Sequence, residues 1–214
     1  MKEIENVQRR PSPAVTPQAL TWDGTNLWMG SRDLRRVYRI EVASWKVLEE
    51  IEPPGIPWAA VSLGKEIAFT IGEDPDDDRY LYRFTPNEGF TRLFAYPDFT
   101  GSYLSYDGTN LYLSQWYKGR ILKMDQRGQV VRTIQLHGEI SGHTFVNDML
   151  YVLHGTEKDG ESWALTRVDP SEEEPTAHDL GWVPFACRSL TFDGKQFWSN
   201  HRAANEIVSF SLPL

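Results

Sequence analysis

The sequence predicts an all-β fold, a five-bladed β-propeller with four-stranded blades, and three observations predict it. A short motif recurs five times along the 214 residues, and its aligned apolar positions lie 40, 44, 39 and 47 residues apart. Those positions are Leu27, Ile67, Leu111, Leu150 and Phe197. Each copy lies among short runs of alternating apolar and polar residues, a pattern typical of strands, and no window has a helical period. Four strands in about forty residues form one propeller blade.

The repeated motif is expected to form the hairpin between the first two strands of each blade. Residues 20–28, 104–112 and 190–198 are near copies of one another, and each contains Asp-Gly. Asp-Gly is a strong hairpin signal because a type I′ turn needs a positive φ at both central residues. Residues 60–68 and 143–151 are weaker copies. The hairpins therefore account for ten of the expected strands.

Further alternating runs follow each hairpin and supply the remaining strands. Third strands are expected at 36–41, 80–84, 120–125, 164–169 and 206–210, and fourth strands at segments such as 46–51 and 129–134. The blades then span about 18–52, 56–96, 100–137, 140–181 and 185–214. Residues 1–214 are thus expected to form a single domain.

The last blade is one strand short, because the sequence ends after its third strand. Residues 2–7 precede the first motif and have no strand to pair with there. We expect this segment to pair with the outer edge of the last blade, which would close the ring and cover an exposed strand edge. The alternative is a frayed N-terminal tail.

Composition and charge limit the expected partners. Asp and Glu number 30 against 22 Lys and Arg, so the net charge is −8. Nucleic acids and anionic membranes are not expected, since both require clustered basic residues. The single cysteine, Cys187, excludes an internal disulfide and a multi-cysteine metal site. We expect a monomer.

The N-terminus has neither an apolar run nor a cleavage-site pattern. No stretch of the sequence approaches 18 apolar residues. These features predict a cytoplasmic protein, although a secreted protein that has lost its leader would have the same sequence.

The predicted fold places a candidate site on one face of the ring. First strands start on this face, and the loops between second and third strands return to it, whereas the Asp-Gly hairpins lie on the opposite face. Aromatic, guanidinium and imidazole groups around a central funnel suit a small polar or anionic ligand. The alternative is that these side chains simply pack the centre. The candidate ligand-binding residues are Gln18, Trp58, Tyr103, Trp116, His143, His154 and Arg188.

Other motifs give weaker signals. Residues 74–78 place carboxylates at the first, third and fifth positions of a calcium-type loop, but Arg79 stands where such a loop requires glycine. No local spacing of histidines suits a metal, so no metal and no cofactor are expected. If the protein is an enzyme, His143 and His201 are the candidate general bases.

Residues 16–28 and 36–48 resemble the first blade of plant-type glutaminyl cyclases, five-bladed propellers that cyclise N-terminal glutamine to pyroglutamate. Gln18 aligns with the first-blade glutamine of that family. The family's glutamate motifs are replaced by Pro57-Trp58 and by residues 100–105 and 140–144. The resemblance implies the fold, and it implies the activity only weakly.

The leading hypothesis is therefore a propeller that binds a small polar ligand or a protein partner on its funnel face. In the second case, the rim aromatics Trp116 and Tyr117 would anchor the protein. The alternative is a cyclase-like acyltransferase or lyase that acts in the central channel.

Overall fold

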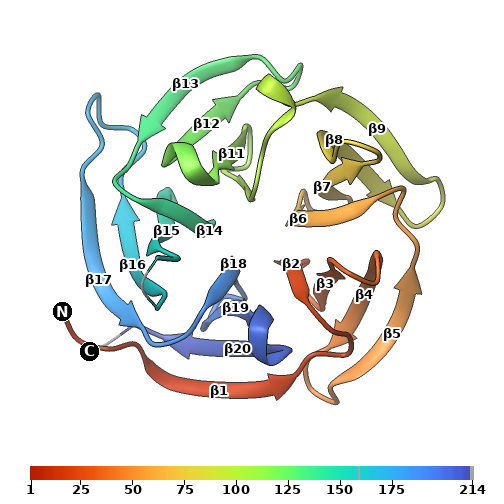
Figure 1. Cartoon of the computed structure of the whole chain (residues 1–214), viewed down its shortest axis with the longest axis horizontal. Helices are drawn as coiled ribbons and strands as arrows, with labels where there is room; N and C mark the ends of the chain where they lie inside the picture. The colour runs from red at the N-terminus through yellow and green to blue at the C-terminus, as the bar shows by residue number, and fades with distance from the viewer. Residues whose placement is uncertain (159, 213–214) are drawn as a thin grey trace.

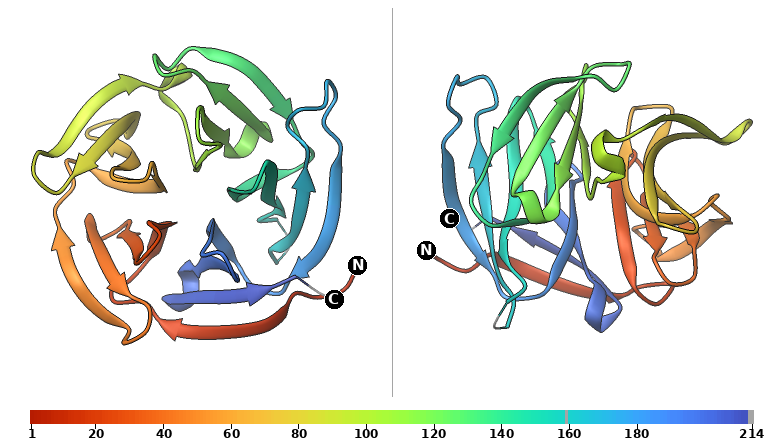
Figure 2. Two further views of the ribbon diagram at one scale, coloured as in Figure 1. Left: turned by 180° about the vertical axis from the view of Figure 1, so that it is seen from behind. Right: turned by 45° about the horizontal axis from the view of Figure 1, so that its top comes forward.

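The computed structural model describes residues 1–158 and 160–212 and contains five four-stranded antiparallel sheets arranged in a ring. The predicted five-bladed β-propeller is confirmed (Figure 1). The outermost strand of each blade follows the circumference, as the two further views also show (Figure 2). No helix in the described residues is long and apolar enough to cross a membrane.

In the first four blades the strands follow the chain from the centre of the ring outward, and in the fifth β1 is the outermost strand. The first two blades comprise β2 (Pro17–Trp22), β3 (Leu27–Ser31), β4 (Arg36–Glu41) and β5 (Lys46–Ile51), then β6 (Ile56–Ser62), β7 (Ile67–Glu73), β8 (Asp78–Thr85) and β9 (Gly89–Ala95). The third and fourth comprise β10 (Leu104–Tyr106), β11 (Leu111–Gln115), β12 (Arg120–Met124) and β13 (Val130–Gln135), then β14 (Glu139–Val146), β15 (Met149–Thr156), β16 (Ser162–Val168) and β17 (Ala177–Val183). The fifth comprises β18 (Cys187–Phe192), β19 (Phe197–His201), β20 (Glu206–Ser211) and β1 (Glu5–Pro11). Short 3₁₀ turns lie at η1 (Pro97–Phe99), η2 (Trp116–Lys118) and η3 (Arg202–Ala204).

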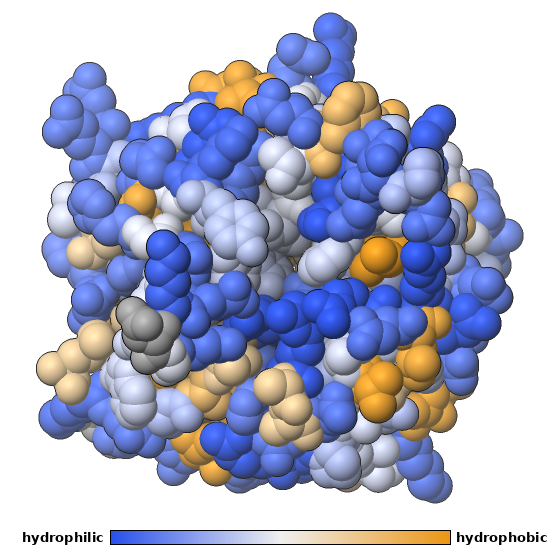
Figure 3. Space-filling model, viewed as in Figure 1, coloured by the Kyte–Doolittle hydropathy of each residue, from blue (hydrophilic) through white to orange (hydrophobic). Residues whose placement is uncertain are grey.

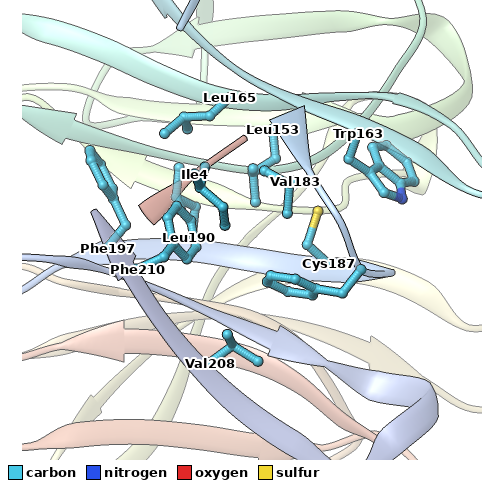
Figure 4. Close-up of a cluster of buried hydrophobic side chains, with 11 residues drawn as sticks. Ile4, Leu153, Trp163, Leu165, Val183, Cys187, Leu190, Phe197, Val208 and Phe210 are labelled. Carbon is cyan, nitrogen blue, oxygen red and sulfur yellow. The ribbon is translucent and has the colours of Figure 1, made fainter. Parts of the chain in front are cut away.

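The hydrophobic core lies between neighbouring blades. Second strands such as β3 are buried on both faces, while outer strands such as β5 are largely exposed. Figure 4 shows the cluster between the fourth and fifth blades, where Leu153 and Trp163 meet Leu190 and Phe210. Each blade therefore buries one face against the next, and a ring of blades is the arrangement in which every blade has two neighbours.

The N-terminal segment closes the ring, as predicted. β1 pairs antiparallel with β20, from Gln8 opposite Ser209 to Pro11 opposite Glu206. The strand covers Glu5–Pro11 rather than residues 2–7, because the first residues turn to the neighbouring blade. There the N–H of Ile4 donates to the carbonyl of Trp182 at 3.0 Å, and Ile4 packs in the core with 4% of its surface exposed.

The Asp-Gly hairpins differ from type I′ turns. In the first blade the loop has four residues, between the paired Trp22 and Leu27. Gly24 has φ +99°, but Asp23 does not adopt a positive φ. Instead, Asp23 Oδ1 accepts the N–H groups of Thr25 (2.8 Å) and Asn26 (2.7 Å). The carboxylate thus replaces the backbone turn, and the loops at Asp107 and Asp193 repeat this arrangement.

Candidate functional site

A pocket of about 260 Å³ lies on the funnel face, around the entrances of the blades. Figure 3 shows this face, with a strongly hydrophilic band across its middle beside a paler hollow. The pocket is lined by Gln18, Arg32, Trp58, Arg79, Ser102, Tyr103, Trp116, Tyr117, Glu157, Arg188 and Arg202. Five of the seven predicted ligand-binding residues are among them: Gln18, Trp58, Tyr103, Trp116 and Arg188.

Two of the four arginines in the lining have both terminal guanidinium nitrogens hydrogen-bonded to the protein. Arg79 donates to both the carboxylate and the carbonyl of Asp77 and to the carbonyl of Gly101. Its guanidinium also lies 3.9 Å from the centroid of the Trp58 ring. With every nitrogen of its guanidinium bonded, Arg79 holds the pocket wall in place.

Arg188 is the second engaged arginine, and it is 3% exposed. Its two terminal nitrogens donate to Glu157 at 2.6 Å, to Glu161 at 3.1 and 3.2 Å, and to the carbonyl of Cys187 at 2.7 Å. The guanidinium also lies 5.0 Å from the ring centroid of Trp116. Arg188 therefore lines the pocket, but its charge is compensated by two carboxylates.

The other two arginines retain unused donors. Within the described residues, the guanidinium of Arg32 is bonded through Nε alone, which donates to Asp33 at 2.8 Å. Arg202 donates from Nη1 to Gln18 Oε1 at 2.6 Å and has no carboxylate within 4.0 Å in the described part of the chain. Burial lowers the pKa of Arg202, and the neighbouring charge of Arg188 lowers it further. Arg202 is thus a half-buried cation without a direct counter-ion.

Gln18 and Tyr103 extend this donor pattern across the pocket floor. Because Gln18 Oε1 accepts from Arg202, its amide nitrogen faces Tyr103 and donates to the phenol oxygen at 3.0 Å. The phenol hydrogen has no acceptor among the described residues. Burial raises the pKa of Tyr103, which therefore stays protonated at neutral pH. A ligand on this floor meets hydrogen-bond donors.

His143 lies behind the wall of the pocket and is not in its lining. Its Nε2 is 3.2 Å from the carbonyl of Tyr103, which can only accept, so Nε2 carries the proton. Nδ1 then accepts from the hydroxyl of Ser105 at 2.7 Å. The ring is 1% exposed, and burial lowers the pKa of His143 to about 3. At neutral pH the imidazole is uncharged, with both nitrogens bonded.

The other two predicted histidines also lie outside the lining. His154 bridges the carbonyl of His137 and the carboxylate of Asp179, each at 3.1 Å, on the fourth blade. The Nδ1 of His201 lies 3.0 Å from Arg9 Nη1 and 3.4 Å from Glu206 Oε2, where β1 closes the ring. The structure does not bring the three imidazoles together.

The carboxylates of residues 74–78, considered above as a calcium-type loop, are bound to neighbouring side chains. The carboxylate of Asp74 binds Arg35, and that of Asp77 binds Arg79 and Trp58.

Arg32 and Arg202 are not among the predicted ligand-binding residues, although the repeat carries a signal for them. Counting five residues on from Leu27, Leu111 and Phe197 leads to Arg32, Trp116 and Arg202. All three line the pocket, because equivalent positions of the repeat occupy equivalent places around the ring.

No protein-family model matches the chain, and no curated protein matches it. Among solved structures, the chain is similar to Myxococcus xanthus glutaminyl cyclase, with a TM-score of 0.71 and 12% identity over 98% of this chain and 95% of that one. It is also similar to the PQQ-bound aldose sugar dehydrogenase of Streptomyces coelicolor, with a TM-score of 0.62 and 12% identity over 97% and 99%.

A third solved structure is Kuenenia stuttgartiensis hydrazine synthase, with a TM-score of 0.59 and 14% identity. The match covers 89% of this chain and 63% of that one, so this chain spans less than two thirds of the length of that neighbour. At these identities the three likenesses show the propeller fold. The family resemblance expected from the first-blade residues is thus supported at the level of the fold.

Proposed function

We propose that the protein binds a small anionic ligand in the funnel pocket. The observation that carries the proposal is Arg202, a half-buried guanidinium that lines the pocket without a carboxylate within 4.0 Å among the described residues. A buried charge without a counter-ion is unfavourable, and an acid group of a ligand would compensate it. Charge-assisted hydrogen bonds to such a group are among the strongest that a protein forms.

Three further features of the pocket support an anion. The terminal nitrogens of Arg32 have no acceptor in the described residues, and the phenol of Tyr103 has a hydrogen to donate. Glu157 is the one carboxylate among the lining residues, and Arg188 already binds it at 2.6 Å. A volume of about 260 Å³ is below the 300–1,000 Å³ that is typical of sites for drug-sized molecules. The ligand is therefore small.

Acetate is the simplest probe of this proposal. A titration with acetate at constant ionic strength should shift the indole N–H resonances of Trp58 and Trp116 in the ¹H–¹⁵N spectrum, because both rings line the pocket. Arg202→Gln should weaken the apparent affinity at least about tenfold, since a charge-assisted bond is lost. A parallel titration with sodium chloride at the same concentrations is the control, because salt screens charges without binding specifically.

Arg36→Gln is the matched control, because Arg36 pairs with Glu50 and Glu52 away from the pocket lining. This variant should titrate as the wild-type protein does. Equal shifts in wild-type protein and Arg202→Gln would contradict the proposal, as would the absence of any acetate-dependent shift.

A cyclase-like enzyme is the second candidate, favoured by the likeness to a glutaminyl cyclase and by the pocket carboxylate of Glu157. We expect the purified protein to convert a glutaminyl peptide to pyroglutamate no faster than buffer does. The reaction needs a group that moves a proton, but Glu157 is paired with Arg188, and both ring nitrogens of the buried His143 are already hydrogen-bonded. Turnover that disappears in both Glu157→Gln and Gln18→Ala would replace our proposal with the enzyme.

A further inference from the structure

The two sides of the pocket differ in chemistry. Arg32 and Arg202, which each retain unused donors, belong to the first and fifth blades, which adjoin in the ring (Figure 1). The aromatic lining belongs to the second and third blades, which also adjoin: Trp58, Tyr103, Trp116 and Tyr117. Available cationic donors therefore face one side of a ligand and rings face the other.

The aromatic wall is held in place by interactions that a ligand need not supply. Trp58 donates from its indole to Asp77 at 2.9 Å and has Arg79 stacked 3.9 Å from its centroid. The rings of Trp116 and Trp163 pack edge to face, with their centroids 5.3 Å apart. The guanidinium of Arg188 lies 5.0 Å from the centroid of the Trp116 ring. The two engaged arginines are thus positioning residues for the two tryptophans. A wall organised in this way binds without the loss of side-chain freedom that would weaken affinity.

We infer that the ligand is an aromatic acid, with its acid group on Arg202 and Arg32 and its ring against Trp58, Tyr103 and Trp116. This inference rests on the proposed anion site and adds the chemical class of the ligand. Indole and phenol rings favour a further ring in offset or edge-to-face contact more than they favour an aliphatic group of equal size. A volume of about 260 Å³ suits a molecule of one or two rings.

Four probes separate the parts of the inference: phenylacetate, cyclohexylacetate, acetate and phenylacetamide. Calorimetry or the indole resonances should give phenylacetate an affinity at least about tenfold above that of acetate, because burial of the ring is favourable. Phenylacetate should bind roughly threefold to tenfold more tightly than cyclohexylacetate, which has the same charge without a π system. Phenylacetamide, which lacks the charge, should bind at least about tenfold more weakly than phenylacetate.

Two substitutions test the aromatic wall. Trp58→Leu should weaken phenylacetate about tenfold more than it weakens acetate, because only phenylacetate has a ring that contacts the indole. Because Trp58 also bonds Asp77, Tyr117→Ala provides a second test that does not depend on folding, since Tyr117 is 84% exposed. It should weaken phenylacetate about threefold more than it weakens acetate. Phe99→Ala, an exposed aromatic on η1 outside the lining, is the control and should leave both affinities unchanged.

The outcomes distinguish this inference from the proposal beneath it. Equal affinities for phenylacetate and acetate would overturn the aromatic class while the anion site remains. Equal affinities for phenylacetate and cyclohexylacetate would overturn the π contribution, again with the anion site intact. If none of the three carboxylates binds, or if phenylacetamide binds as well as phenylacetate, the anion site fails and the inference fails with it.

Discussion

Deletion of residues 1–11 is expected to lower the free energy of unfolding by at least about 3 kcal/mol, because core packing and a complete strand ladder are lost together. β1 supplies the outer strand of the last blade, and its removal leaves β20 with an unpaired edge. Ile4 is 4% exposed and packs with Phe197, Val208 and Phe210 between the fourth and fifth blades. Chemical denaturation monitored by tryptophan fluorescence would measure the loss.

Ile4→Ala separates the two contributions to closure. Truncation of a buried isoleucine to alanine costs about 2–5 kcal/mol, but it keeps β1 paired with β20. The deletion should be less stable than this variant, and it should also self-associate on size-exclusion chromatography because of its exposed strand edge. A deletion protein with the denaturation midpoint of the full chain would show that closure does not stabilise the ring.

Acidification from pH 7 to pH 4 is expected to destabilise the protein by about 3 kcal/mol through His143 alone. Burial lowers the pKa of His143 to about 3, whereas its ordinary value is 6.5. Below pH 6.5 the unfolded chain therefore binds a proton that the folded protein does not bind. The stability that comes from a neutral His143 is present above pH 6.5, and it is lost as the pH falls towards 3.

His143→Gln isolates this contribution, because carboxylates also respond to acid in every variant. The glutamine amide can donate to the carbonyl of Tyr103 and accept from Ser105 as the imidazole does, but it does not titrate. Its free energy of unfolding should fall less between pH 7 and pH 4 than that of the wild-type protein. His178→Gln, an exposed position on β17, is the control and should follow the wild-type protein. Parallel pH profiles for His143→Gln and the wild-type protein would contradict the assignment.

His143 also shows why residue type alone is a weak guide to a site. Imidazole near a funnel suggests a base or a ligand-binding group, and the sequence pattern placed His143 correctly at a first strand. The role of the His143 ring depends on Ser105 and on the backbone carbonyl of Tyr103, which lie 38 and 40 residues away in the chain. These two groups hydrogen-bond both nitrogens of the ring. Whether a ring faces the pocket or lies behind its wall follows from this packing, and the repeat does not specify it.

The amino-acid sequence determined the fold and the face of the ring on which the first strands start. A period of about forty residues specifies one blade, five periods specify the ring, and the unpaired segment before the first motif specifies closure. The blade pattern is local and repeats along the chain, so one sequence is enough to display it. The same periodicity placed Gln18, Trp58 and Arg188 at equivalent blade entrances, and all three line the pocket.

The tertiary structure alone decided which of these groups a ligand can meet. Arg202 and Gln18, 184 residues apart, are bonded because closure brings the fifth blade beside the first. Arg188 is engaged by the carboxylates of Glu157 and Glu161 from the neighbouring blade, while Arg202 has no carboxylate partner among residues 1–158 and 160–212. The engagement of a charged group is set by contacts between distant segments, and those contacts exist only in the folded ring.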